Sequence, residues 1–163
     1  MAEVPTHLRR WPTTAARQAL AARLGLPYDR QMQDWEWEVA DPACFTNWLA
    51  VYRDDALSDD ERFSLAEMLI QRVEDTLPNA GPPAEVEALP QWQAVRELLR
   101  ERSRLHASSI AYWSAFGRDD SEVPFRVSVL MRRVWEAVQP ALGTQRHAEP
   151  GAAPDPARIV GFP

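Results

Sequence analysis

A helix-capping signal followed by a long apolar stripe constrains the fold of this chain more than any other feature. Ser58 and Glu61 stand three residues apart, the spacing at which each side chain satisfies the other's backbone amide at a helix start. Apolar residues then recur at three- to four-residue spacing until Pro78. They are Leu65, Ala66, Leu69, Ile70, Val73 and Leu77. The sequence therefore predicts an amphipathic helix over residues 59–77.

Four further segments have the same helical periodicity. Thr13 or Thr14 can cap the first of them, and Asp41-Pro42 places a capping carboxylate before a proline at the first helical position of the second. The predicted helices cover residues 14–24, 42–54, 90–116 and 124–138. Together with the helix over 59–77, they predict an all-α, single-domain bundle of about five helices.

Residues 34–39 break the helical pattern, because acidic and large apolar side chains alternate along them with a period of two. One side would carry Asp34, Glu36 and Glu38, and the other Trp35, Trp37 and Val39. We expect an extended acidic and aromatic segment, or a short lone strand, before the second helix. Its tryptophans would face the core and its carboxylates the solvent.

Proline positions divide the rest of the chain. Residues 1–12 are expected to form an arm that Trp11 pins to the core, ahead of a helical domain over residues 13–142. A proline-rich connection is predicted at residues 78–90, without a helix or strand of its own. The last residues, 143–163, have the composition of a flexible or wrapping tail.

Composition narrows the class of protein. A net charge of −6 argues against nucleic acid as a partner, since phosphate binding needs a basic face. Cys44 is alone, so no intrachain disulfide is expected. No apolar run has the length of a signal peptide core or a membrane span, which favours a cytoplasmic protein with no membrane partner. All 18 basic residues are arginine, which is typical of a genome rich in GC and favours a bacterial source.

Sequence signatures of catalysis are missing, so no catalytic residue, cofactor or metal ligand is predicted. The chain has no phosphate-binding glycine loop, nucleophile elbow, His-Glu-x-x-His motif or Cys-x-x-Cys motif. Asp59, Asp60 and Glu61 are candidate Mg²⁺ ligands, but acids in the first turn of a capped helix have a simpler role against its dipole. His106, among apolar residues, is a candidate general base; a satisfied core histidine is the more common outcome.

Acidic residues concentrate between positions 29 and 62, where ten acids face three arginines and the net charge is −7. Such a segment steers basic partners, and its aromatic residues supply the rigid surface found at interface hot spots. An alternative is that the tryptophans are core anchors and the acids a solvated face. The predicted partner-binding residues are Asp34, Trp35, Glu36, Trp37, Glu38, Asp54, Asp55, Asp59 and Asp60.

The stretch Asp34-Trp35-Glu36-Trp37-Glu38-Val39-Ala40-Asp41, followed by Trp48-Leu49-x-x-Tyr52 and Leu57-Ser58-Asp59-Asp60-Glu61-Arg62-Phe63, resembles a group of small acidic bacterial proteins. Some of these look like the immunity partners of polymorphic toxins. The resemblance covers residues 26–77. Together with the size of the chain, its concentrated acidic charge and the missing catalytic motifs, it favours a non-enzymatic immunity protein that neutralises a basic toxin domain through its acidic face. The alternatives are an adaptor or regulator of another cellular protein, and a small carboxylate- and metal-dependent hydrolase using Asp59, Asp60, Glu61 and His106.

Overall fold

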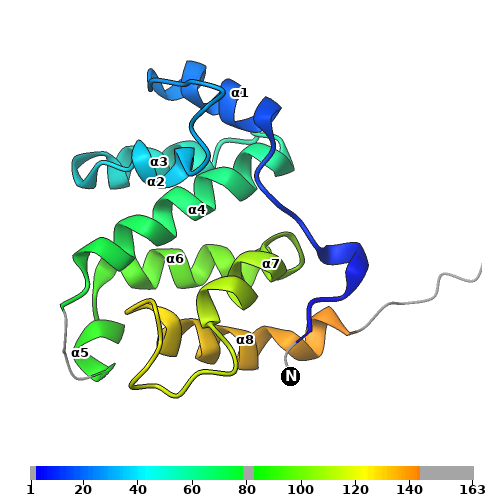
Figure 1. Ribbon diagram of the computed structural model, residues 1–163, viewed down its shortest axis with the longest axis vertical. Helices are drawn as coiled ribbons and strands as arrows, with labels where there is room; N and C mark the ends of the chain where they lie inside the picture. The colour runs from blue at the N-terminus through cyan, green and yellow to red at the C-terminus, as the bar shows by residue number, and fades with distance from the viewer. Residues whose placement is uncertain (1–2, 79–82, 144–163) are drawn as a thin grey trace, which may run out of the picture.

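The computed structural model describes residues 3–78 and 83–143 (Figure 1). These residues form an all-α protein, as the periodicity predicts, with eight α-helices and two 3₁₀ turns where the sequence predicts about five helices. In chain order the elements are η1 (Thr6–Leu8), α1 (Thr14–Leu24), α2 (Trp35–Glu38), η2 (Pro42–Cys44), α3 (Phe45–Tyr52), α4 (Asp59–Thr76), α5 (Pro83–Glu87), α6 (Pro90–Glu101), α7 (Ser103–Ser114) and α8 (Ser128–Leu142).

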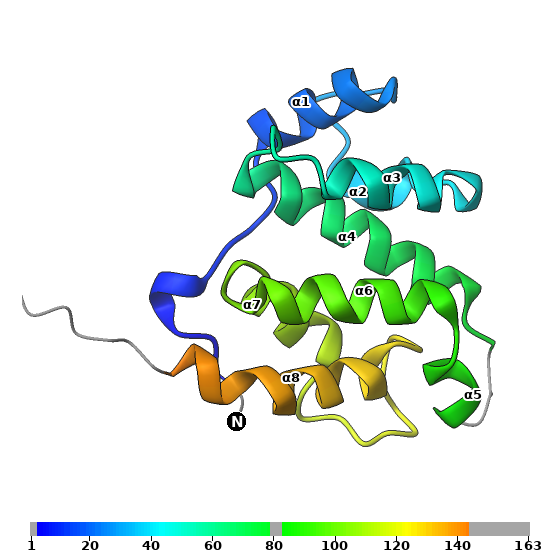
Figure 2. The same ribbon diagram turned by 180° about the vertical axis from the view of Figure 1, so that it is seen from behind.

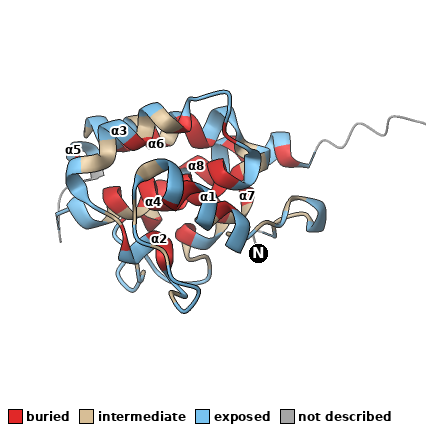
Figure 3. Cartoon of the chain, turned by 90° about the horizontal axis from the view of Figure 1, so that it is seen from above, coloured by how far each residue is buried: buried red, intermediate tan, exposed pale blue. Residues whose placement is uncertain are grey.

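Helix α4 is the centre of the fold. Helices α1, α2 and α3 pack on one side of it and α6 and α7 on the other, with α8 against α6 and α7 (Figures 1 and 2). Every residue from Glu61 to Ile70 is buried, so this helix is covered on all sides rather than along one stripe (Figure 3). The predicted capping box is confirmed: the Glu61 amide donates to Ser58 Oγ and the Ser58 amide donates to Glu61 Oε2.

The single helix predicted over residues 90–116 is wrong, because the chain turns at Arg102 between α6 and α7. Arg102 has φ −117° and ψ 43°, outside the helical region. The apolar stripe continues across this break, from Leu98 and Leu99 in α6 to Ala107 and Ile110 in α7. Periodicity alone therefore gives no sign of the turn, which allows α7 to pack along both α4 and α8.

The extended segment predicted before the second helix is also wrong, because Trp35–Glu38 form the short helix α2. Trp35 is fully buried and its indole nitrogen donates to the Pro27 carbonyl at 2.8 Å. Glu36 is buried beside it, whereas Trp37 and Glu38 are exposed. One helical turn thus replaces the predicted alternation of inward tryptophans and outward acids, and no described strand is available to pair with this segment.

The other predictions are confirmed in their main features and corrected at their ends. Helix α1 has the predicted bounds, and Thr13 accepts from the Ala16 amide. Asp41 caps η2 by accepting from the Ala43 amide, so residues 42–52 form a 3₁₀ turn followed by α3. The prediction that residues 78–90 contain no helix or strand is wrong, because Pro83–Glu87 form the short helix α5, with a proline at its first position. Helix α8 begins at Ser128 and continues through Pro140. Residues 144–163, predicted as a tail, lie outside the described residues.

No helix in the described ranges is long and apolar enough to cross a membrane.

Candidate functional site

The nine residues predicted to bind a partner have different environments. Trp35 and Glu36 are buried, Trp35 in the hydrophobic core and Glu36 in an ion pair with Arg17. Asp34, Trp37 and Glu38 are exposed at α2. Asp54, Asp55, Asp59 and Asp60 are exposed around the loop from α3 to α4 and the first turn of α4. The buried pair supports the surface that the exposed residues form.

Arginines from outside the acidic segment neutralise much of it. Arg10 pairs with Asp60, and Arg23 lies 3.8 Å from carboxylate oxygens of both Asp54 and Glu61. Arg17 forms a two-pronged ion pair with Glu36, at 2.9 and 2.8 Å. The negative field of this face is therefore weaker than the charge of residues 29–62 suggests. Asp34, Glu38 and Asp55 make no ion pair within the described part of the chain.

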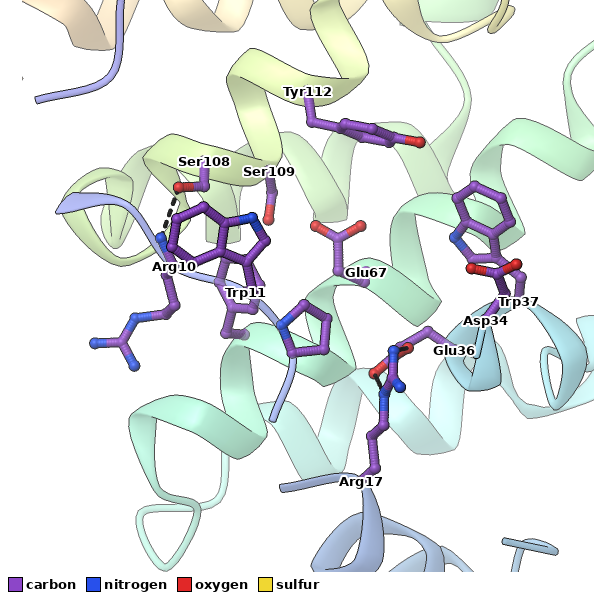
Figure 4. Close-up of a pocket in the computed structure, with 12 residues that line it drawn as sticks. Arg10, Trp11, Arg17, Asp34, Glu36, Trp37, Glu67, Ser108, Ser109 and Tyr112 are labelled. Atoms are coloured by element: carbon purple, nitrogen blue, oxygen red, sulfur yellow. Dashed lines mark hydrogen bonds and ion pairs between the residues drawn. The ribbon is translucent and has the colours of Figure 1, made fainter. Parts of the chain in front are cut away.

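A cavity of about 310 Å³ opens beside α2, between the N-terminal arm, α4 and α7. The three large hydrophobic side chains that are exposed in the described residues all line it: Trp11 is 69% exposed, Trp37 39% and Tyr112 54% (Figure 4). They come from three segments far apart in the sequence. Exposed aromatic side chains scattered singly need no explanation, but their collection around one cavity indicates a binding site.

Trp113 holds two of these rings in place. Its buried indole contacts both of them, with its ring centroid 6.0 Å from that of Trp37 and 5.8 Å from that of Tyr112. Phe125 completes the cluster at 4.6 Å from Trp113. Aromatic pairs at these separations contribute about 0.5–1.5 kcal/mol each beyond the area they bury. Trp37 and Tyr112 are therefore exposed on one side and fixed on the other.

The third ring, Trp11, is placed by the backbone on either side of it. The Arg10 amide donates to Ser108 Oγ on α7 at 2.8 Å, and the Arg10 side chain pairs with Asp60 on α4. Two residues after Trp11, Thr13 caps α1. The prediction that Trp11 pins the arm to the core is thus wrong: the polar contacts of Arg10 fix the arm, and the indole is left facing solvent.

A buried carboxyl group lies inside the aromatic rim. Glu67, on α4, is 9% exposed and its Oε2 accepts a 2.8 Å hydrogen bond from the Trp113 indole nitrogen. Burial raises the pKa of Glu67 above its ordinary value and the charge of Glu36 adds to the rise, whereas Ser109 and the Trp113 indole oppose it. The carboxyl is therefore held in an environment that favours its neutral form.

Ser109 lies next to this carboxyl and also lines the cavity (Figure 4). Its side chain is 1% exposed, and its hydroxyl makes no hydrogen bond of normal geometry within the described residues. Buried polar groups in native proteins almost always have a partner. Ser109 is close enough to Glu67 to favour its charged form, yet its hydroxyl lacks a hydrogen bond of normal geometry, so a polar ligand in the cavity can engage it.

His106 is separate from this cavity. Its Nε2 lies 2.7 Å from the Tyr52 hydroxyl, Phe63 stacks on its ring, and both His106 and Tyr52 are buried. Burial and the nearby Arg102 and Arg10 lower the pKa of His106 to about 3, while burial raises the pKa of Tyr52 to about 12. Neutral His106 is thus a core residue, hydrogen-bonded to Tyr52.

The three candidate Mg²⁺ ligands, Asp59, Asp60 and Glu61, have other partners. Asp60 pairs with Arg10, Asp59 lies 4.0 Å from Arg62, and Glu61 completes the capping box. The described residues contain no group of three or more histidine, cysteine or acidic side chains that could hold a metal ion. The structure therefore does not bring Asp59, Asp60, Glu61 and His106 together as a hydrolase would need.

Sequence reasoning identified Asp34, Glu36 and Trp37 but missed the other residues that line the cavity. Glu67 has a recognisable signal, since it follows Phe63 by four residues and precedes Ile70 by three, on one face of a long apolar helix. A carboxylate at such a position is rarely buried without a reason. Trp11, Ser109 and Tyr112 give no comparable signal, because only the packing of the arm and α7 brings them to α2.

No protein-family model matches the chain, and no curated protein or solved structure is significantly similar to it. A function therefore has to follow from the side chains themselves.

Proposed function

We propose that this chain is a non-enzymatic protein-binding module that recognises a basic partner through the aromatic cavity and the acids beside it. One observation supports this most strongly: Trp11, Trp37 and Tyr112, the large hydrophobic side chains left exposed among the described residues, all surround one cavity. Tryptophan and tyrosine supply large, rigid contact areas and are enriched at the energetic centres of interfaces.

The charges around the cavity favour a basic partner. Asp34 lines the cavity and Glu38 is exposed on the same helix, and neither is neutralised by a described arginine. Arg17, which also lines the cavity, is already held by Glu36 of α2 in two hydrogen bonds. A lysine or arginine side chain of the partner can therefore pair with Asp34 or Glu38, whereas a carboxylate of the partner would find Arg17 already paired.

This proposal changes the roles first expected for the acidic segment. Trp35 and Glu36 position α2 from within, Asp34, Trp37 and Glu38 contact the partner, and Asp55 contributes to steering. Asp54, Asp59 and Asp60 have a reduced part in it, because their ion pairs with Arg23, Arg62 and Arg10 would have to open. An immunity role against a basic toxin domain agrees with this surface, and rests on the resemblance of residues 26–77.

Site-specific crosslinking in cells tests the proposal. A photoreactive phenylalanine analogue at Trp37 is expected to crosslink one protein, which mass spectrometry then identifies. The same analogue at Gln93 is the matched control, because Gln93 is exposed on α6 and does not line the cavity. The crosslinked protein is then purified and its affinity measured for the wild type, Asp34→Lys and Glu97→Lys.

The proposal requires that Asp34→Lys slow association with this partner and weaken the dependence of binding on salt, while Glu97→Lys on α6 does neither. A partner bound equally well by all three proteins would show that the cavity is not the interface. Crosslinks of equal yield from Trp37 and Gln93 would contradict it as well. If the partner is a secreted toxin whose activity the chain abolishes, the immunity role follows; if it is a housekeeping protein, the chain is an adaptor or regulator.

A further inference from the structure

We propose that the cavity is a subsite for one cationic side chain, a lysine or arginine of the partner, whose charged head reaches Glu67 while its aliphatic stem lies between Trp11, Trp37 and Tyr112. This inference rests on the proposed function and adds the chemical group that is recognised. It assigns to Glu67 and Ser109 a binding role in addition to the exposed acids of α2.

The arrangement of the side chains supports such a subsite. In Figure 4 the three rings lie around the opening, with the Glu67 carboxyl between them and the Ser109 hydroxyl beside it. The Trp113 indole donates its hydrogen bond to Oε2 of Glu67, so we assign Oε1 to the ligand. A ligand donor that reaches both Oε1 and the Ser109 hydroxyl would give each of them a hydrogen bond of normal geometry.

A cation fits these groups better than any other ligand. The faces of aromatic rings attract ammonium and guanidinium groups by about 0.5–2 kcal/mol each, depending on how far the site is desolvated. An apolar side chain would offer no polar partner to the Ser109 hydroxyl or to Glu67 Oε1, and a buried polar atom left without a partner costs about 1–3 kcal/mol. An anion would meet Asp34, which makes no ion pair within the described residues, while the two arginines of the cavity wall, Arg10 and Arg17, are already paired.

Binding of a cation also changes the protonation state of Glu67. In the empty cavity, burial raises the pKa of Glu67 and favours the neutral acid. A cation within hydrogen-bonding distance favours the carboxylate instead, so the Glu67 proton leaves to solvent as the ligand enters. The other charged or titratable groups of the cavity are Arg10 from the arm, Arg17 from α1, Asp34 and Glu36 from the α2 segment, and Tyr112 from α7.

Blocked amino acids test the subsite without knowledge of the partner. Titration calorimetry is carried out with N-acetyl-lysine methylamide, N-acetyl-arginine methylamide and N-acetyl-norleucine methylamide, the last of which keeps the aliphatic stem but has no charge. Pentylamine serves as a free amine of similar length. We expect the lysine or arginine derivative to bind at least about tenfold more tightly than the norleucine derivative, as a charge-assisted hydrogen bond implies.

Glu67→Gln provides the matching variant, because the amide keeps the size of the side chain and an oxygen for the Trp113 hydrogen bond. It should remove the preference for the charged ligand, while Glu97→Gln on α6 should keep it. Circular dichroism and thermal unfolding of Glu67→Gln establish that it folds. Trp37→Ala should weaken binding of all the derivatives, since the stem would lose one wall of the cavity.

Equal binding of charged and uncharged derivatives to the wild type, or a preference that survives in folded Glu67→Gln, would overturn the subsite. Tighter binding of pentylamine than of blocked lysine would overturn the assignment to a partner side chain and identify a free amine as the ligand. The partner proposal fails separately, if the protein crosslinked at Trp37 binds Asp34→Lys as well as it binds the wild type.

Discussion

The Trp113 indole donates a 2.8 Å hydrogen bond to the Glu67 carboxyl, and the same indole packs against Trp37 and Tyr112. One buried side chain therefore fixes both the aromatic rim of the cavity and its acidic floor. The two residues come from α7 and α4, so the packing of these helices decides whether the site exists. A disturbance of Trp113 should affect stability, ring positions and the acidity of Glu67 together.

Replacement of Glu67 by glutamine should stabilise the protein at neutral and alkaline pH. The pKa of Glu67 is raised in the folded protein, so the folded state holds this proton more tightly than the unfolded state does. The stabilising effect is complete below the ordinary pKa of 4.5 and is lost as pH rises through the folded value. Glutamine cannot ionise, and the free energy of unfolding of Glu67→Gln should therefore exceed that of the wild type most clearly at high pH.

Urea unfolding at a series of pH values measures this effect, with Glu97→Gln as the control, because Glu97 is exposed on α6 and does not line the cavity. A gap between wild type and Glu67→Gln that stays constant with pH would show that Glu67 has an ordinary pKa when folded. A gain in stability together with a loss of cation binding is the pattern expected of a residue retained for function.

Replacement of Trp113 by phenylalanine should destabilise the fold by about 2 kcal/mol, through lost volume and the lost donor to Glu67. Because the indole hydrogen bond lowers the pKa of Glu67, its removal should raise that pKa further and weaken binding of the cationic derivatives at pH 7. Trp135→Phe is a matched control, since Trp135 is also buried but its indole nitrogen has no partner in the described residues.

The comparison is made by thermal unfolding and by calorimetry of both variants. Equal loss of cation affinity in Trp113→Phe and Trp135→Phe would reduce the effect to general destabilisation and contradict a specific link between Trp113 and Glu67.

The pair Tyr52 and His106 should make the fold sensitive to acid. The pKa of His106 is lowered from its ordinary value of 6.5 to about 3. Between these two pH values, His106 is protonated in the unfolded chain but neutral in the folded protein. Stability therefore falls as pH decreases through this range, by at most roughly 5 kcal/mol for the shift concerned. His106→Gln should flatten this part of the stability curve, whereas an unchanged slope would mean that His106 is protonated inside the fold.

Tyr52→Phe should cost about 1–3 kcal/mol, because it leaves His106 Nε2 buried without its only hydrogen-bond partner in the described structure. Tyr28→Phe is the control, since Tyr28 is only partly buried and no hydrogen bond of its hydroxyl is seen there. Chemical unfolding at pH 7 measures both. A cost for Tyr52→Phe no larger than that for Tyr28→Phe would contradict the account of this pair.

Lysine should not be able to replace Arg62 without a loss of stability. Its buried guanidinium donates to three backbone carbonyls around the loop between α3 and α4, those of Tyr52, Asp54 and Leu57. Lysine lacks the planar fork that reaches all three, so Arg62→Lys should cost about 2–3 kcal/mol. The control Arg133→Lys alters an exposed ion pair with Glu87 and should cost less than about 1 kcal/mol. Equal unfolding midpoints for the two variants would refute this role.

The sequence predicted those parts of the fold that local interactions determine. The capping box of α4 and the bounds of α1 depend on neighbouring residues, and both are confirmed. The break at Arg102 and the helical turn at Trp35–Glu38 depend on remote partners: α6 and α7 bury a continuous stripe on different neighbours, and Arg17 draws Glu36 inward. For the same reason the exposed acids of α2 were predictable, whereas the meeting of Trp11, Tyr112 and Glu67 was not.

The acidity of Glu67, followed by carbon NMR of its labelled carboxyl group, tests the central claim most directly. The carboxyl is titrated in the free protein and again in the presence of saturating N-acetyl-lysine or N-acetyl-arginine methylamide, whichever binds more tightly. We expect a pKa above the ordinary value of 4.5 in the empty cavity and a clear fall when the cation is bound. A pKa that is the same with and without bound ligand would place the cation elsewhere and contradict the cavity as its site.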